Sequence, residues 1–340
     1  MLMKLGILKS YKEIDDLVVS YSNACKEVGV DFVVIDLLAD TWIEDIKNSQ
    51  VDGILVREKA NIDEYKQMYN ERLWVIKEYL KIPIYPSWHE LFLYEDKRMY
   101  AYFFKTHNIP TPPTHIFYRK ADAAQYMKNA TYPLISKTNG GSTGSGVQKI
   151  TSWGGGKRLI YNVFGRIDPR LAIGDFKWAK INKLIRVPKI GMAQRHYLII
   201  QEYIDIETEW RIIKIGDTYA GYKRPIENGH ASCDLMEYGF PPYELLSLIK
   251  RIAEEEHFDS LSIDVLLDKK GKYYVTEMQS LYGSFSLTQC EVGGKSGRII
   301  EKDGEFVFEE GKDFFRFNSN VLRVRDFVEK IRNGYYSYKR

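Results

Sequence analysis

The chain has 340 residues, of which 44% are hydrophobic and 28% are charged, with 25 Gly and 11 Pro. This composition excludes a disordered or fibrous protein, and because a single core stops growing at roughly 250 residues, we expect two or three packed subdomains. The 49 Lys and Arg against 46 Asp and Glu leave a net charge of +3, which excludes whole-molecule attraction to nucleic acid or to an anionic membrane.

The cysteines indicate a reducing compartment. Cys25, Cys233 and Cys290 are odd in number and never in a Cys-x-x-Cys spacing, so neither a disulfide framework nor a zinc site is expected. The chain has no window of about 18 uncharged apolar residues, and its first apolar run is too short for a secretion signal. We therefore expect a cytoplasmic protein with no nucleic-acid or membrane partner. The sequence leaves the oligomeric state open, a homo-oligomer included.

Short apolar, β-branched runs at 4–9, 32–36 and 53–56 predict strands, and the segments 12–29 and 61–80 carry helical patterns. Together they predict a small βαβ-type domain. A further strand at 82–86 leads to Asp96, a plausible N-cap for a helix over 97–107. The prolines between 110 and 113 end that helix, so we place a domain boundary near 94–112.

Strands at 132–137 and 146–150 flank a glycine-rich loop, after a short helix at 120–129. Residues 151–195 show no clear hydrophobic periodicity of either the helical or the strand type. Within this stretch, residues 157–195 hold ten Lys or Arg against two Asp, a local charge of 10 − 2 = +8. Alternation typical of strands returns at 197–204, 210–215 and 219–223, before a helix at 242–257 and a hairpin at 261–279.

The first candidate for chemistry is the segment that runs from Lys137 to Val147, a strand-end lysine followed by a loop rich in Gly, Ser and Thr. Glycine lets backbone N–H groups approach phosphate oxygens and form an anion nest. The loop is neither a Walker A loop nor a dinucleotide turn. A plain linker is the alternative, but linkers separate domains, whereas this loop joins two apolar strands.

The second candidate is the hairpin at 261–279. If Leu267 pairs with Lys272, Asp264 lies opposite Val275, and Asp264, Glu277 and Gln279 share one face. The other face would then hold alternating residues of both strands in the core, Tyr274 and Thr276 among them. Two carboxylates and an amide oxygen are hard ligands of the kind that Mg²⁺ takes beside nucleotide phosphates. A solvated strand face with incidental acids is the alternative.

The third candidate is Gln201-Glu202-Tyr203-Ile204, which ends an apolar strand and precedes several acids and arginines. Extended backbone at a strand end can hydrogen-bond an adenine edge, a nearby glutamate can hold ribose hydroxyls, and arginines can neutralise transferred phosphate. Charged residues after a strand are also typical of an ordinary solvent-exposed surface, which is the alternative interpretation.

In this order the segments resemble the ATP-grasp superfamily over about 90–290, with the preceding α/β domain in its expected place. The resemblance implies that Lys97 and Lys137 reach the nucleotide phosphates under a mobile loop. It also implies that the hinge after 200 reads adenine, and that Glu209 or Glu207 holds the ribose. The implied nucleotide-binding residues are Lys97, Lys137, Gly141, Ser142, Thr143, Gly144, Gln201, Glu202, Tyr203, Ile204 and Glu209.

The resemblance also implies a substrate side and a metal site. Arg224 would hold a developing acyl phosphate, and Arg211 is the other candidate. Asp264, Glu277 and Gln279 resemble the Asp and Glu-x-Asn ligands of two magnesium ions, which Mn²⁺ could replace. Gln279 places its amide oxygen one methylene further out than the usual asparagine. Within the superfamily the chain looks most like the carboxylate–amine ligases of the glutathione synthetase and ribosomal-protein glutamate ligase branch.

The expected fold class is α/β, of the α+β ATP-grasp type. We expect an N-terminal α/β domain at 1–93, a small subdomain at 94–204 with the phosphate loop and the basic insert, and a C-terminal subdomain at 205–340 with the metal site. The expected function is an ATP-dependent ligase that joins a carboxylate to an amine through an acyl phosphate, releasing ADP and phosphate. A small-molecule phosphotransferase and a non-catalytic nucleotide-binding protein stay open as alternatives.

The basic insert at 157–195 bears on the substrates, which would be small molecules, peptides or saccharides. A basic segment is most often only a solvated face. Because this one lies between the phosphate loop and the adenine hinge, ten cationic side chains near the site would raise the local concentration of an anionic substrate. We therefore expect that one substrate is a polyacid, such as an acidic peptide or a saccharide that carries uronic acids.

Overall fold

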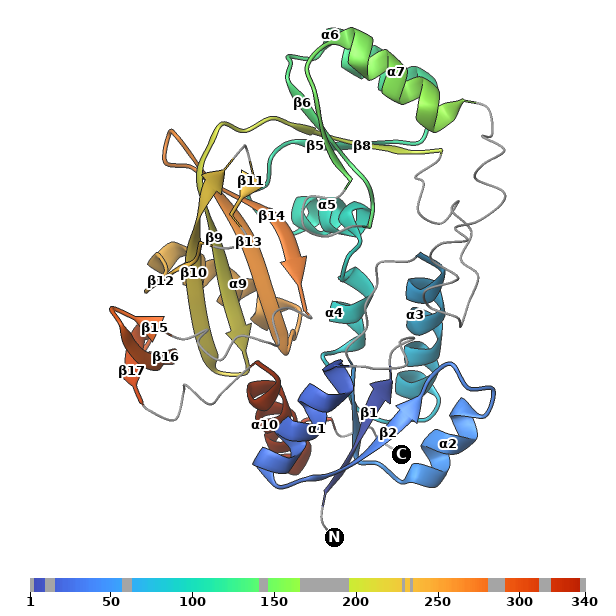
Figure 1. The fold of residues 1–340 in the computed structure, drawn as a ribbon, viewed down its shortest axis with the longest axis vertical. Helices are drawn as coiled ribbons and strands as arrows, with labels where there is room; N and C mark the ends of the chain where they lie inside the picture. Colours follow the sequence, from blue (N-terminus) through green and yellow to red (C-terminus); the bar gives the residue numbers. More distant parts are fainter. Residues whose placement is uncertain are drawn as a thin grey trace.

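The computed structural model describes residues 3–9, 16–56, 63–140, 146–165, 196–227, 230–232, 235–280, 291–311 and 319–336. The predicted loop residues Gly141, Ser142, Thr143 and Gly144 lie outside these ranges, as does 166–195 of the basic insert. None of the helices in the described ranges is long and apolar enough to cross a membrane. Three sheets organise the described residues (Figure 1).

The first sheet consists of four parallel strands in the order β2-β1-β3-β4, at the bottom of Figure 1. Helices cover both of its faces, so its strands are continuous apolar runs rather than alternating ones. The elements are β1 Lys4–Lys9, α1 Asp16–Val28, β2 Asp31–Asp36, α2 Trp42–Ser49, β3 Gly53–Leu55, α3 Asp63–Glu78 and β4 Ile84–Tyr85. The sequence predicted all of them except α2.

The helix near the C-terminus of the chain, α10 (Ser319–Arg332), packs against this N-terminal sheet beside α1 (Figure 1). Its Val324 and Phe327 are buried in one cluster with Leu5 and Ile7 of β1. Lys330 adds ion pairs to Asp259 and to Asp326 at 2.6 and 2.7 Å. Residues more than 300 positions apart in sequence therefore build one core, which no local pattern indicates.

The second sheet has four antiparallel strands in the order β5-β8-β6-β7 and lies at the top of Figure 1. Helices α6 and α7 cover its outer face, where Leu134 and Leu198 are buried. Alternation turns Lys137 and Gln201 to the opposite face. The elements are β5 Thr114–Phe117, α6 Lys120–Asn129, β6 Leu134–Lys137, β7 Val147–Ile150, α7 Trp153–Phe164 and β8 Leu198–Glu202.

Helix α7 occupies part of the stretch in which the sequence showed no period. Three glycines follow Trp153 in its first turn and are poor helix formers, but the Ser152 side chain caps the helix by accepting from the Gly155 N–H. A Cβ atom on Gly156 would approach the Met127 side chain within 2.7 Å. The glycine therefore permits close packing of α7 on α6, which overrides its intrinsic propensity.

The third sheet has nine strands, with the path β14-β13-β9-β10-β16-β15. Helices α5 and α9 pack on one of its faces, with Leu245 and Ile249 against Ile212, Ile263 and Val265. The elements are β9 Ile206–Ile215, β10 Thr218–Glu227, β11 His230–Ala231, β12 Glu237–Tyr238, α9 Tyr243–Glu255, β13 Ser260–Asp268, β14 Tyr273–Gln279, β15 Glu291–Val292, β16 Lys295–Lys302 and β17 Glu305–Glu310. Helices α4 Trp88–Leu93 and α5 Lys97–Thr106 connect the first sheet to the other two. The domain boundaries at 93/94 and 204/205 stay predictions.

The hairpin of β13 and β14 differs from its predicted register. Leu267 pairs with Tyr273 rather than with Lys272, and a bulge after Asp264 places Glu277, not Val275, opposite that aspartate. The extra residue turns Val275 into the core, where Thr276 had been expected. The prediction that Asp264 and Glu277 share one face is nevertheless correct. The pairing at Leu267 is shifted by one residue, and the extra residue of the bulge cancels this shift before Glu277.

Candidate active site

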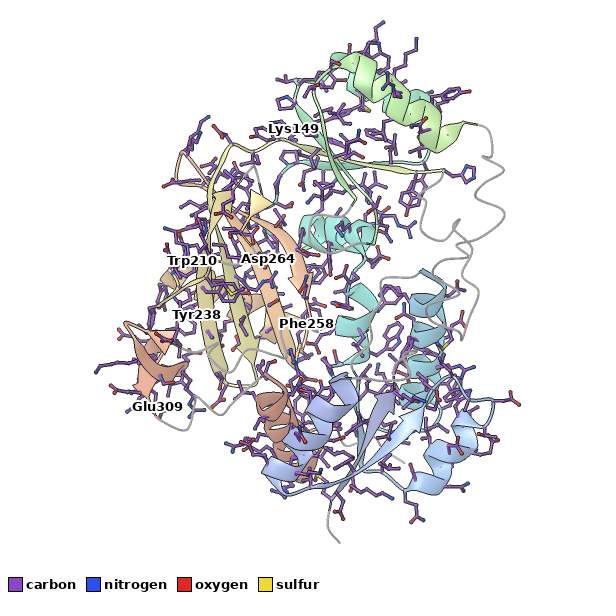
Figure 2. The ribbon with its side chains drawn as sticks, viewed as in Figure 1. Lys149, Trp210, Tyr238, Phe258, Asp264 and Glu309 are labelled. Atoms are coloured by element: carbon purple, nitrogen blue, oxygen red, sulfur yellow. The ribbon has the colours of Figure 1, made fainter. Side chains whose placement is uncertain are left out.

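A row of polar residues crosses four neighbouring strands on the face of the large sheet that α9 does not cover. Tyr222 of β10 lies opposite Arg211 of β9, which lies opposite Asp264 of β13, which lies opposite Glu277 of β14. Asp264 lies in the middle of this sheet in Figure 2. Opposite residues point to the same face, so the predicted metal ligands and the predicted substrate-side arginine come together.

Two arginines hold the acids of this face. The Arg211 Nε and Nη2 atoms donate to Asp264 Oδ1 and Oδ2, both at 2.6 Å, in a bidentate pair. Arg224 pairs with Glu209 and approaches Asp264 Oδ2 at 3.4 Å. All four side chains are largely buried, the exposed fractions being 17% for Arg211 and 7% for Asp264. The two arginines therefore neutralise carboxylates of the protein itself.

The pKa values follow from these contacts. Burial would raise the pKa of Asp264, but Arg211 and Arg224 overcome this effect and hold the pKa below its ordinary value. The pKa of Glu277 is raised, chiefly by burial and by the charge of Asp264, against the opposing effect of Lys97, Arg211 and Lys137. Glu277 is thus the carboxylate whose charge is least compensated.

Among the described residues, three buried polar atoms on this face have no hydrogen-bond partner: Glu277 Oε1, Arg224 Nε and Ser262 Oγ. Ser262 lies opposite Gln279 and two residues before Asp264, so it shares their face. A buried polar atom without a partner costs about 1–3 kcal/mol. Their gathering on one face indicates that a polar ligand completes the site.

Two lysines face these acids, Lys137 from the small sheet and Lys97 from α5. Burial lowers the pKa of Lys137 to about 8, with Glu277 opposing the change and Lys97 reinforcing it. The side chains of both lysines therefore lie within electrostatic range of the carboxylate on the large sheet. Lys97 is the first residue of α5, whose N-cap Asp96 accepts from the Met99 N–H at 3.0 Å.

Asn139 fixes this arrangement, and the sequence reasoning missed it. Its backbone carbonyl accepts from the Lys97 N–H at 3.2 Å, and its Oδ1 accepts from the Arg98 N–H at 3.0 Å. Asn139 follows Lys137 by two residues, so it ties the strand of one lysine to the helix start of the other. An asparagine directly before a glycine-rich loop was the signal available in the sequence.

The predicted adenine hinge lies where the chain passes from the small sheet to the large one. The Gln201 side chain is buried and donates to Thr114 Oγ1 at 2.8 Å. Glu202 ends β8 and is exposed. The Lys149 ammonium lies 4.1 Å from the centre of the Tyr203 ring, and Ile204 is half-buried before β9 begins.

The donor set of this site fits a magnesium ion bound together with phosphate. Asp264, Glu277 and Gln279 offer oxygen ligands on one face, and Glu277 Oε1 has no partner in the part of the chain that the structure describes. Within the described ranges, no group of three or more His, Cys, Asp or Glu side chains is placed to hold a metal by itself. A set of two carboxylates and an amide therefore needs further oxygens, which nucleotide phosphates and water supply.

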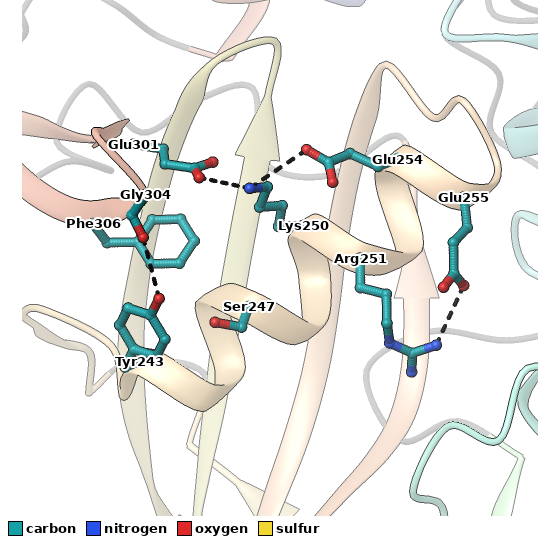
Figure 3. A pocket seen from close by; sticks show the side chains of 9 residues that line it. All are labelled: Tyr243, Ser247, Lys250, Arg251, Glu254, Glu255, Glu301, Gly304 and Phe306. Carbon is teal, nitrogen blue, oxygen red and sulfur yellow. Dashed lines mark hydrogen bonds and ion pairs between the residues drawn. The ribbon is translucent and has the colours of Figure 1, made fainter.

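A second surface, on the outer side of α9, offers no comparable chemistry (Figure 3). The pocket there measures about 300 Å³. Its Lys250 pairs with Glu301 at 2.6 Å and with Glu254 at 3.7 Å, and Tyr243 donates to the Gly304 carbonyl. These groups satisfy one another on an exposed helix face, so they are typical of a solvated surface.

Comparison with known proteins agrees with this architecture. No protein-family model matches the chain. The chain is 27% identical over 219 residues to the alpha-aminoadipate–LysW ligase LysX of Saccharolobus solfataricus, over 63% of this chain and 71% of that protein.

Several solved structures share the fold. D-cycloserine synthetase DcsG superposes with a TM-score of 0.59 at 14% identity, over 96% of this chain and 99% of that one. A RimK-domain ATP-grasp protein of Sphaerobacter thermophilus gives 0.56 at 14% identity, over 83% and 93% of the two chains. The ADP complex of N5-carboxyaminoimidazole ribonucleotide synthetase gives 0.56 at 14% identity, over 87% and 76%. The chain has the ATP-grasp fold, and the fold class predicted from the sequence is confirmed.

Proposed function

We propose that this chain, an ATP-grasp protein by its fold, is an ATP-dependent carboxylate–amine ligase. The observation that carries the proposal is the meeting of Lys137 of the small sheet and Lys97 of α5 with the acids and arginines of the large sheet. They surround Glu277 Oε1, which has no hydrogen-bond partner among the described residues. These residues would hold a triphosphate, and none of them is placed as a nucleophile–base pair. Phosphoryl transfer needs mainly positioning and charge neutralisation, which these residues provide.

For the nucleotide, Lys97 and Lys137 would bind the phosphates, and the hinge from Gln201 to Ile204 would receive the adenine. Magnesium bound by Asp264, Glu277 and Gln279 would offset phosphate charge. Glu209 could hold a ribose hydroxyl only by sharing its carboxylate with Arg224, because the two side chains are paired.

For the chemistry, a substrate carboxylate would attack the γ-phosphate to give an acyl phosphate and ADP. An amine would then displace phosphate and leave an amide. Arg224 and Arg211 would bind the anionic acyl phosphate from the sheet face, since guanidinium groups match phosphate oxygens in pairs. Arg211 would have to give up at least one of its two hydrogen bonds to Asp264 for this role.

Relatives support the same class of reaction. The relative from Saccharolobus is named as a ligase, and DcsG is named as a synthetase. We extend this class to the present chain, with small-molecule, peptide or saccharide carboxylates and an amine as substrates.

ADP release, measured with amino acids and acidic sugars offered singly and in carboxylate–amine pairs, tests the proposal, with products weighed by mass spectrometry. We expect ADP release only when both a carboxylate and an amine are present. The mass of the product should equal the sum of the two substrates minus one water. Glu277→Gln serves as the inactive control. ADP release with a hydroxyl acceptor and a phosphorylated product would instead identify a phosphotransferase, and nucleotide binding without any release would identify a non-catalytic protein.

A polyanionic substrate is the finer part of this proposal and follows from the charge of +8 in 157–195. Replacing Lys177, Lys180 and Lys183 with serine should raise the KM of that substrate at low salt and leave the KM of ATP less affected. Added salt should have the same selective effect, because attraction beyond about 10 Å is screened at 0.1 M salt. An unchanged KM in the triple variant would mean that the insert is only a solvated surface.

A further inference from the structure

A second pocket opens between the N-terminal domain and the start of α5, and the proposed nucleotide chemistry leaves it unused. It measures about 720 Å³. Residues of α3 and α4 form one wall, and Asp96, Arg98 and Asn139 form the other. The volume lies within the range of sites for ligands larger than a single amino acid.

This pocket adjoins the predicted phosphate site. Asp96 and Arg98 flank Lys97, and Asn139 accepts the Lys97 N–H. Asn139 also follows Lys137 by two residues at the end of β6. A ligand in the pocket can therefore extend a reactive group toward the two lysines while the rest of it stays against α3 and α4.

The wall formed by α3 and α4 is aromatic. Trp88 stacks on Phe92 with 5.0 Å between ring centres, and Trp74 meets Trp88 edge to face at 5.3 Å and 65°. The Trp88 indole N–H donates to the Asn70 carbonyl at 3.1 Å, which fixes the orientation of that ring. Trp74 is 42% exposed, so part of its ring is accessible from the pocket that it lines.

The two tryptophan rings form a corner and not a parallel slot. Planar rings prefer offset-stacked or edge-to-face partners, and a flat ligand that enters a binding slot stacks between parallel faces. A corner of two rings at 65° instead suits a puckered ring, which has C–H groups on its faces and polar groups around its rim.

Polar side chains surround this corner. Asn70 lines the pocket, and its Oδ1 atom has no hydrogen-bond partner among the described residues. Because that atom is shielded from solvent, a ligand could donate to it only after the side chain turns toward the pocket. Glu71 and Asp96 add carboxylate acceptors on opposite walls, and Arg98 and Asn139 stand beside Asp96. The Lys66 ammonium already donates to the Leu91 and Phe92 carbonyls. The pocket therefore offers a ligand more hydrogen-bond acceptors than cationic donors.

We propose that this pocket binds the sugar ring of a saccharide-bearing substrate, with the C–H face of the ring against Trp74 and Trp88 and its hydroxyls donating to Asn70 and the flanking carboxylates. The reacting carboxylate or amine of the sugar then points to Lys97 and Lys137. This assignment of a substrate class rests on the proposed ligase function.

Calorimetric titration of the full chain without ATP tests the pocket directly. The probes are D-glucuronate, D-galacturonate and N-acetyl-D-glucosamine, with L-glutamate, L-tryptophan and adenine as comparison ligands. We expect at least one sugar to bind more tightly than every comparison ligand. Trp74→Ala should weaken that binding tenfold or more, whereas Tyr79→Ala, which removes an aromatic ring 73% exposed just beyond α3, should leave it unchanged.

Variants of Asn70 give a second test that separates hydrogen bonding from packing. Asn70→Asp keeps an acceptor oxygen and should retain sugar binding, whereas Asn70→Leu should weaken it about tenfold. ATP affinity, measured in each variant, should stay within twofold of the parent and shows that the fold is intact.

The outcomes separate this inference from the proposed function. If sugars bind through Trp74 but no carboxylate–amine pair supports ADP release, the pocket assignment stands and the ligase function fails. If amino acids support amine-dependent ADP release and no sugar of the panel binds, the ligase function stands and the sugar assignment is overturned. Tighter Trp74-dependent binding of adenine or L-tryptophan than of any sugar also overturns it, in favour of a planar ligand.

Discussion

Replacing Arg211 with methionine removes one of the two cations that hold Asp264. The pair is bidentate at 2.6 Å and largely buried, and only Arg224, at 3.4 Å from Oδ2, would remain beside that carboxylate. Removing one partner of a buried ion pair costs about 3–5 kcal/mol. Because Arg224 still compensates part of the charge, we expect the lower end, about 3 kcal/mol of unfolding free energy.

Arg298→Met is the matched control. Its Nε atom donates to Glu309 Oε2 at the same 2.6 Å, but Glu309, labelled in Figure 2, lies at the sheet surface and its side chain is 45% exposed. An exposed pair contributes about 0–1 kcal/mol. The Arg298 pair has the same hydrogen-bond length as the Arg211 pair, but it makes one bond to Glu309 instead of two and is more exposed. Urea unfolding in the absence of metal should therefore separate the two variants by at least about 2 kcal/mol.

The Arg211→Met variant should also differ from the parent in metal binding and in how its free energy of unfolding depends on pH. Without Arg211 the carboxylates face less positive charge, so Mn²⁺ binding measured by electron paramagnetic resonance should tighten. Asp264 has a lowered pKa, so its pairing stabilises the fold above the ordinary aspartate value and the contribution is lost as pH falls. The difference in unfolding free energy between the parent and Arg211→Met should therefore become smaller as the pH falls. Equal losses in the two arginine variants, or weaker Mn²⁺ binding, would refute the reasoning.

Three further predictions concern single residues. Lys137→Ala should abolish turnover and weaken ATP binding, and in the parent, ATP affinity should fall about tenfold between pH 7 and 9 as the ammonium with pKa about 8 loses its proton. Lys137→Arg should flatten that profile, and a pH-independent affinity in the parent would contradict the assignment. Glu277→Gln should abolish magnesium-dependent turnover while Gln279→Asn is tolerated, and equal losses would show another role for the glutamine. Gly53→Ala should cost about 1–3 kcal/mol in urea unfolding, because its Cβ would overlap the Phe327 ring of α10, and Phe327→Leu should relieve much of that cost.

Local patterns in the sequence predicted the elements that carry the site. Apolar alternation gave strands β6, β8 and β13, and the face shared by Asp264 and Glu277 followed from the period of two. The bulge after Asp264 was missed because alternation does not report an extra residue, whose effect depends on how the partner strand packs. Glycines at the start of α7 likewise suggested an irregular segment, although the close approach of Met127 to Gly156 makes a small residue necessary there.

Contacts between distant segments could not be predicted. The pairing of Arg224 with Glu209 needs the register of β9 and β10, and the burial of Phe327 among residues of β1 and α1 needs the whole fold. Nothing in the neighbourhood of Asn139 in the sequence shows that α5 begins beside it. Such contacts form only in the complete fold, where residues far apart in sequence form ion pairs and hydrogen bonds with one another.

One of these distant contacts connects the proposed sugar pocket to the candidate active site. Glu90 lies on α4, the helix that also carries Trp88 and Phe92, and its Oε1 accepts from the Ser260 N–H at 2.7 Å while its Oε2 accepts from the Ser87 N–H at 2.7 Å. Ser260 begins β13, four residues before Asp264. Burial and the nearby Asp259 raise the pKa of Glu90 above its ordinary value, and the hydrogen bond from the Ser260 N–H opposes this change. The aromatic wall is thereby fixed to the strand of the metal ligands, and a substrate held in that pocket would keep a constant position relative to the transferred phosphate.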